Sequence, residues 1–136
     1  MRPARRGARR LPRGSRGAAV VDFVLVLAVL VPLFLGILQV ALVLLVRNTL
    51  AAAASEGARY AATADRGPAD GVARTRSQIE GAVSGRFAQS VHARPAMVDG
   101  APGIVVRVHA SVPALGLGGP AVELDVAGHA VEEEPS

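Results

Sequence analysis

The pattern of apolar and polar positions changes sharply along the first 46 residues. Residues 1–17 hold seven arginines among small residues and prolines, with too few apolar groups to pack, so a disordered leader is expected. From Phe23 to Val46 the only polar side chain is Gln39. At ~1.5 Å per residue this run forms a helix of ~36 Å, enough to cross a ~30 Å hydrocarbon core. A soluble helix of that length would show a polar stripe, so residues 18–46 are predicted to be a transmembrane helix.

The next segment predicts that this helix continues beyond the membrane. Residues 47–62 are rich in alanine, the best helix former, and place one apolar face at Leu50, Ala54, Ala58 and Ala61. Glu56 and Arg59 lie three positions apart and can pair on the exposed side. Gly57 is the weak point of this extension, which otherwise makes one continuous helix from Ala18 to Ala62.

Residues 63–131 are predicted to form a small separate domain. Asp65–Gly71 is a loop by its Gly, Pro and Asp content. Apolar residues at every fourth position then predict an amphipathic helix over residues 73–91, with its apolar face at Ile79, Val83, Phe87 and Val91.

The period of the pattern changes to two in the last third of the chain. Residues 104–112 alternate between apolar and mixed positions, which predicts a half-buried strand preceded by a hairpin turn at 99–103. Residues 122–126 alternate again after a Gly/Pro loop, and this strand continues toward Val131. The predicted fold class is therefore α+β: a single-span membrane protein whose long N-terminal helix and short second helix accompany a small antiparallel sheet.

Charge is distributed unevenly. Seven of the 15 arginines precede Ala18, whereas the rest of the chain has eight arginines and eleven acidic residues, three of them in a solvated tail at residues 132–136. An arginine-rich tail can bind nucleic-acid phosphates, but beside a membrane span the positive-inside rule explains it better. We therefore expect a cytoplasmic N-terminus, an extracytoplasmic C-terminal domain in the cell membrane, and no nucleic-acid partner.

The sequence shows little that could support catalysis. Cysteine is absent, and the three histidines, at positions 92, 109 and 129, fit no metal-ligand spacing. No nucleophile elbow, phosphate-binding loop or dinucleotide fingerprint occurs. We expect no enzyme activity, catalytic residue, cofactor, metal site or small-molecule substrate.

Two features of the apolar run suggest a role in helix packing. Asp22 lies at its start, where a membrane span has no use of its own for a carboxylate. If the chain is cut between Gly17 and Ala18, Asp22 becomes the fifth residue and can neutralise its own new N-terminus or that of a neighbouring subunit. Further on, Pro32 removes a backbone hydrogen bond and Gly36 leaves a notch, so a helix kink is expected there.

These residues carry a resemblance to a known family. Gly17–Phe23 (GAAVVDF), after arginines and before an apolar run, resembles a class III, prepilin-type signal sequence, in which an acidic residue, normally Glu, is fifth after the cut. With residues 30–36 (LVPLFLG) and 54–62 (ASEGARYAA), the chain is similar to the TadE-like family of pilus-assembly proteins, the minor pilins or pseudopilins of tight-adherence (Flp-type) pili. The most specific part of the match is the family motif formed by Glu56, Gly57, Ala58 and Arg59.

The resemblance implies a set of partners and a processing event. A prepilin peptidase would cut after Gly17, and Asp22 with Phe23 would then pair with the N-terminus of another subunit. The implied partners are membrane lipid, the peptidase, other pilin-like subunits and the pilus assembly platform.

Two other interpretations remain open at this level. The chain can be a generic bitopic membrane protein whose outer domain binds an envelope partner. Alternatively, a secretory signal peptide cut near Ala52–Ala54 would release a soluble domain, although the apolar run is longer than a signal-peptide core.

Overall fold

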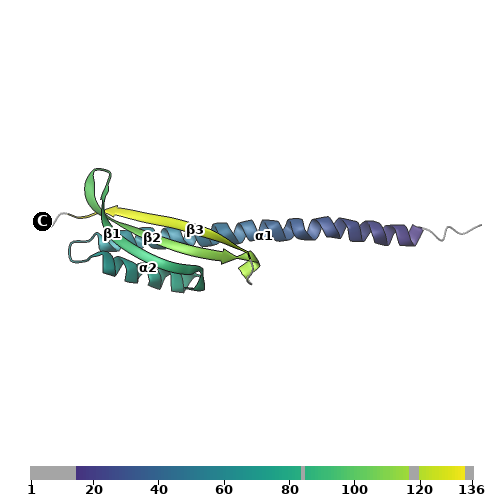
Figure 1. Cartoon of the computed structure of the whole chain (residues 1–136), viewed down its shortest axis with the longest axis horizontal. Coiled ribbons are helices and arrows are strands. Elements are labelled where there is room, and N and C mark those ends of the chain that lie inside the picture. The colour runs from purple at the N-terminus through teal and green to yellow at the C-terminus, as the bar shows by residue number, and fades with distance from the viewer. Residues whose placement is uncertain (1–14, 84, 117–119, 134–136) are drawn as a thin grey trace, which may run out of the picture. The chain divides into compact units, whose positions relative to one another are not determined.

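The computed structural model describes residues 15–83, 85–116 and 120–133, and it confirms the α+β class (Figure 1). The disorder predicted for the leader falls mainly on residues 1–14, which lie outside this range. The elements in chain order are helix α1 (Ser15–Ala61), helix α2 (Pro68–Ala82), strand β1 (Ala88–Val98), strand β2 (Ala101–Pro113) and strand β3 (Ala121–Val131). Short 3₁₀ turns occupy Gly85–Phe87 (η1) and Ala114–Gly116 (η2).

Helix α1 belongs to two compact units, which divide between Gly36 and Ile37. In the first unit every residue of α1 from Gly17 to Gly36 is exposed, although the segment is almost wholly apolar. By length and apolar composition, α1 contains the one candidate membrane span of the described chain, Gly17–Ala61, as the single-span fold class predicts.

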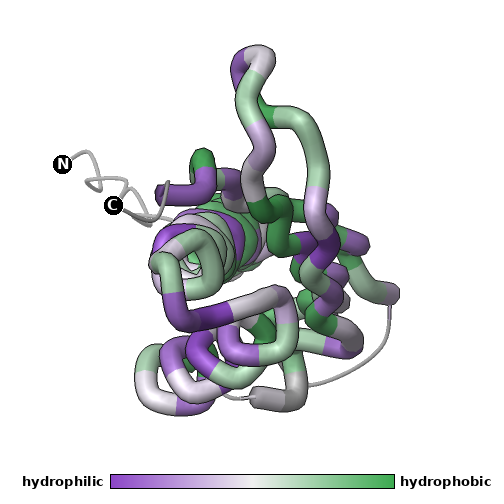
Figure 2. The backbone as a smooth tube through the Cα atoms, turned by 90° about the vertical axis from the view of Figure 1, so that its left-hand side faces the viewer, coloured by the Kyte–Doolittle hydropathy of each residue, from purple (hydrophilic) through white to green (hydrophobic). Residues whose placement is uncertain are grey.

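The second unit forms its core between α1, α2 and one face of a three-stranded antiparallel sheet in the order β1-β2-β3. The predicted alternation in β2 is confirmed, since the five apolar residues at alternate positions face this core and are at most 1% exposed: Ile104, Val106, Val108, Ala110 and Val112. Arg107, His109 and Ser111 lie on the other face together with Val105, and Figure 2 shows the backbone coloured by hydropathy.

Helix α1 contributes its apolar face to the same core. Val46, Leu50, Ala54 and Ala58 are at most 1% exposed, in agreement with the face predicted for the extended helix. Small residues on this face let the sheet approach the helix backbone. Gly128 of β3 lies so close that a Cβ atom there would overlap the backbone of Ala54 and Ser55.

The hairpin between β1 and β2 is tighter than predicted. Only Asp99 and Gly100 form the turn, with φ angles of 51° and 84°. Two successive positive φ values are typical of a type I′ turn, which favours Asp-Gly because this turn matches the twist of the flanking strands.

The second helix differs most from the prediction. It spans Pro68–Ala82 and not residues 73–91. Its first turn uses the predicted loop residues, because Pro68 suits the first helical position and the Asp70 carboxylate accepts a hydrogen bond from the Gly67 N–H at 2.9 Å. The helix ends at Ala82, one residue after Gly81, a weak helix former.

The four-residue spacing that predicted a longer helix reflects a shared core. Ile79, Phe87 and Val91 are all buried, but they come from α2, η1 and β1 respectively. Burial of these residues in the same core therefore produced a four-residue spacing that resembles the period of a helix.

Candidate functional site on the long helix

The predicted processing site lies in the first turns of α1. Gly17 is helical, and nothing lies within 4 Å of the position where its Cβ would be. Ala18 is exposed as well. The bond between them is therefore uncovered by any other described segment.

Asp22 and Phe23 follow on the same uncovered part of the helix. Phe23 is 63% exposed, and Asp22 is exposed without an ion pair to any other residue that the structure describes. Ala18 and Asp22 lie four positions apart, so they share one helix face. The structure thus presents the carboxylate without an internal partner among the described residues.

Pro32 and Gly36 do not interrupt α1, which stays helical through both. Pro32 has no N–H to donate to the Ala28 carbonyl, and no atom lies within 4 Å of a Cβ at Gly36. The kink at these residues stays a prediction.

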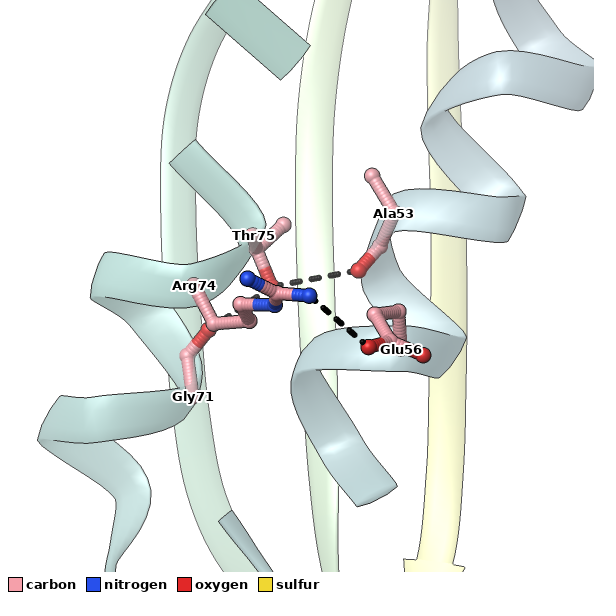
Figure 3. Close-up of polar contacts among 5 residues, drawn as sticks. All are labelled: Ala53, Glu56, Gly71, Arg74 and Thr75. Atoms are coloured by element: carbon pink, nitrogen blue, oxygen red, sulfur yellow. Dashed lines mark hydrogen bonds and ion pairs between the residues drawn. The ribbon is translucent and has the colours of Figure 1, made fainter. Parts of the chain in front are cut away.

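The family motif begins where α1 meets α2, and Figure 3 shows its first residue, Glu56, beside Arg74 of α2. Gly57 permits the contact, because a Cβ there would overlap the Thr75 hydroxyl and lie 2.7 Å from the Gly71 carbonyl oxygen. Thr75 is completely buried, and its hydroxyl donates to the carbonyl of Gly71 at 2.8 Å, with the Ala53 carbonyl at 3.4 Å. The helices therefore meet through backbone and small side chains.

Glu56 binds α2 from the exposed side of this contact. Its carboxylate pairs with the Arg74 guanidinium at 3.2 Å, which replaces the pairing with Arg59 that the sequence suggested. The partner of Glu56 changes because α2 brings a cation to it from outside its own helix, which spacing along α1 could not reveal.

A second polar contact lies nearby, where Arg66 stacks on the ring of Tyr60 with its guanidinium carbon 3.6 Å from the ring centroid.

The other two motif residues have different roles. Ala58 is completely buried in the core of the second unit. Arg59 is exposed and belongs to the last turn of α1, where a positive charge interacts favourably with the helix dipole.

Sequence reasoning did not assign a role to Gln39. Its side-chain Oε1 accepts a hydrogen bond from the Leu115 N–H in η2 at 2.5 Å. The signal was present, since Gln39 is the only polar side chain between Phe23 and Val46, but its partner lies 76 positions away.

The histidines do not gather into a metal site among the residues that the structure describes. His109 lies on the polar face of the sheet, with its Nδ1 3.0 Å from Asp125 Oδ1 and its Nε2 3.2 Å from Glu123 Oε2. These side chains are substantially exposed and form a cross-strand cluster of polar side chains between β2 and β3.

Comparison with known proteins gives one match. The family model for TadE-like proteins matches residues 17–59, which confirms the resemblance over that segment. The match begins at the glycine of the predicted processing site and ends within the motif that contacts α2. The matched residues lie within the candidate membrane span, Gly17–Ala61. No curated protein and no solved structure matches the chain.

Proposed function

We propose that this chain, TadE-like over residues 17–59, is a minor pilin or pseudopilin of a tight-adherence pilus. It is anchored by α1 with its N-terminus in the cytoplasm and its second unit outside, and it acts by helix packing without catalysis. The observation that carries the proposal is the family match, whose first residue is Gly17.

Processing creates the N-terminal ammonium group with which Asp22 can pair. A prepilin peptidase hydrolyses the Gly17–Ala18 bond, which leaves a carboxylate on Gly17 and an ammonium group on Ala18. Asp22 is exposed on α1 and has no ion-pair partner among the described residues. In a medium of low dielectric constant an unpaired charge is costly, so the pairing of Asp22 with an N-terminal ammonium favours one register between neighbouring helices.

The exposed apolar surface supports subunit packing. Large side chains project all around α1 in the first unit, including Phe23 and Phe34 at 63% and 59% exposure. In a bilayer these contact lipid, and in an assembly they pack against the same segment of other subunits. The kink at Pro32 and Gly36 would let this segment adapt to such packing.

A series of Asp22 variants that either remove or keep the negative charge tests this function. Asp22→Asn and Asp22→Ala should still be cleaved and stay in the membrane, but they should fail to co-assemble with the other pilus subunits. Asp22→Glu, which keeps the charge and adds one methylene, should assemble. Cross-linking of subunits in membranes and counting of surface pili measure the effect.

Two outcomes would contradict the proposal. One is normal pilus assembly by the Asp22→Ala variant. The other is normal pilus assembly in cells that lack the chain altogether, which would favour the generic membrane anchor with an unrelated envelope partner.

A further inference from the structure

The described residues at the end of the β2–β3 hairpin are apolar and partly or fully exposed. Between Ser111 and Glu123 the sequence contains no polar side chain. Leu115 and Val122 are 38% and 42% exposed, and Pro120 is exposed beside them. A tip of this composition on a small domain indicates an apolar partner.

The hydrogen bond to Gln39 places Leu115 beside the part of α1 that belongs to the second unit (Figure 1). From Gln39 to Val46 the helix advances ~10 Å, and from Leu115 back to Ser111 the chain covers a similar ~10 Å. The first polar residues after both apolar segments, Arg47 and Ser111, therefore lie at about the same height. The apolar residues of this part of the helix and of the hairpin end therefore lie at the same depth relative to a membrane.

The backbone of the tip is prepared for an environment without water. Pro113 and Pro120 have no N–H group. The Ala114 N–H donates to the Pro120 carbonyl at 3.1 Å, and the Leu115 N–H donates to Gln39. No backbone donor of these four residues is left without a partner, which lowers the cost of moving this part of the backbone out of water.

We propose that the hairpin end, formed by Pro113, Ala114, Leu115 and Pro120–Val122, inserts into the lipid leaflet beside α1. The partner of the hairpin end is the bilayer surface, because the hairpin end lies beside apolar residues of the candidate membrane span in the second unit. An insertion of ~10 Å is typical of interfacial elements. The inference depends on the membrane anchor and is independent of any role in a pilus.

The sequence makes a direct test possible, because it contains no cysteine. Leu115→Cys and, separately, Val122→Cys are labelled with an environment-sensitive fluorophore in the full chain. The protein is reconstituted into vesicles of phosphatidylcholine and phosphatidylglycerol. The matched control is Met97→Cys, which is 68% exposed near the other end of the sheet.

Labels at Leu115 and Val122 should show blue-shifted emission, several-fold stronger quenching by doxyl-labelled lipid than Met97, and protection from aqueous iodide. Equal iodide quenching at all three positions would overturn the proposal. Protection that disappears when the protein is diluted with excess lipid would also overturn it, because the occupant would then be a second copy of the chain. The use of two labelled positions separates insertion from a local effect of replacing Leu115.

Discussion

Gly57 of α1 and Thr75 of α2 lie so close together that a Cβ atom on Gly57 would overlap the Thr75 hydroxyl. The same contact places Gly71 against α1, where a Cβ would lie 2.8 Å from that of Ala61 and 2.9 Å from the Gly57 carbonyl oxygen. The glycine of the family motif is therefore required for the packing of α2, and it does not break α1.

Gly57→Ala should destabilise the second unit by about 1–3 kcal/mol, because the new methyl group overpacks a contact made of backbone and a buried hydroxyl. Gly81→Ala is the matched control, since Gly81 is also helical but nothing lies within 4 Å of its Cβ position. Thermal unfolding of the full chain in detergent measures both variants. An unchanged midpoint for Gly57→Ala would contradict the close helix contact.

Gly128→Ala tests the approach of β3 to α1. The added methyl group would overlap the backbone of Ala54 and Ser55, so we expect a loss of about 1–3 kcal/mol and displacement of the strand. Ala127→Val changes the neighbouring exposed position on the polar face, where a β-branched residue suits a strand, and should leave the stability nearly unchanged. Equal stability of the two variants would show that β3 does not pack on the helix backbone.

The Glu56–Arg74 pair should contribute little to folding. Both side chains are more than two-fifths exposed, at 42% for Arg74 and 43% for Glu56, so a double-mutant cycle with Gln at each position should give a coupling of about 0.2–1 kcal/mol that falls with added salt. A coupling well above that range would mean that the pair is shielded from solvent, for example by a neighbouring subunit.

Gln39→Leu should release the Leu115 amide. The substitution removes the side-chain acceptor of this N–H, and in the lipid environment proposed for the hairpin end an unsatisfied donor costs about 1–3 kcal/mol. Amide hydrogen exchange at Leu115, followed by NMR in lipid nanodiscs, should accelerate in Gln39→Leu and stay slow in Gln39→Glu, which keeps a carbonyl oxygen. Equally slow exchange in both variants would exclude Gln39 as the partner.

The sequence was a good guide wherever the pattern is local. The apolar run of α1, the alternation of β2 and the strand ending at Val131 follow from the residues themselves. A period of two, for example, needs only one buried face to appear in the sequence, and β2 provides it from Ile104 to Val112.

Contacts between distant segments could not be predicted in this way. The partner of Glu56 is Arg74 on another helix, and the partner of Gln39 is the backbone amide of Leu115 in η2. The length of α2 was wrong for a related reason, because Phe87 and Val91 reach the core from different elements than Ile79. The sequence shows which polar side chains need a partner, whereas the fold shows which residue that partner is.

The most direct test of the proposed function is the N-terminus of the mature chain, determined by mass spectrometry of a C-terminally tagged form from the cells that normally produce it. The account predicts a start at Ala18, retention in the membrane, and loss of this product in the Gly17→Leu variant. A start at Met1 or Arg2 would contradict prepilin-type processing and leave a plain membrane anchor. A start near Ser55 would show instead that a secretory signal peptide had been removed and the domain released.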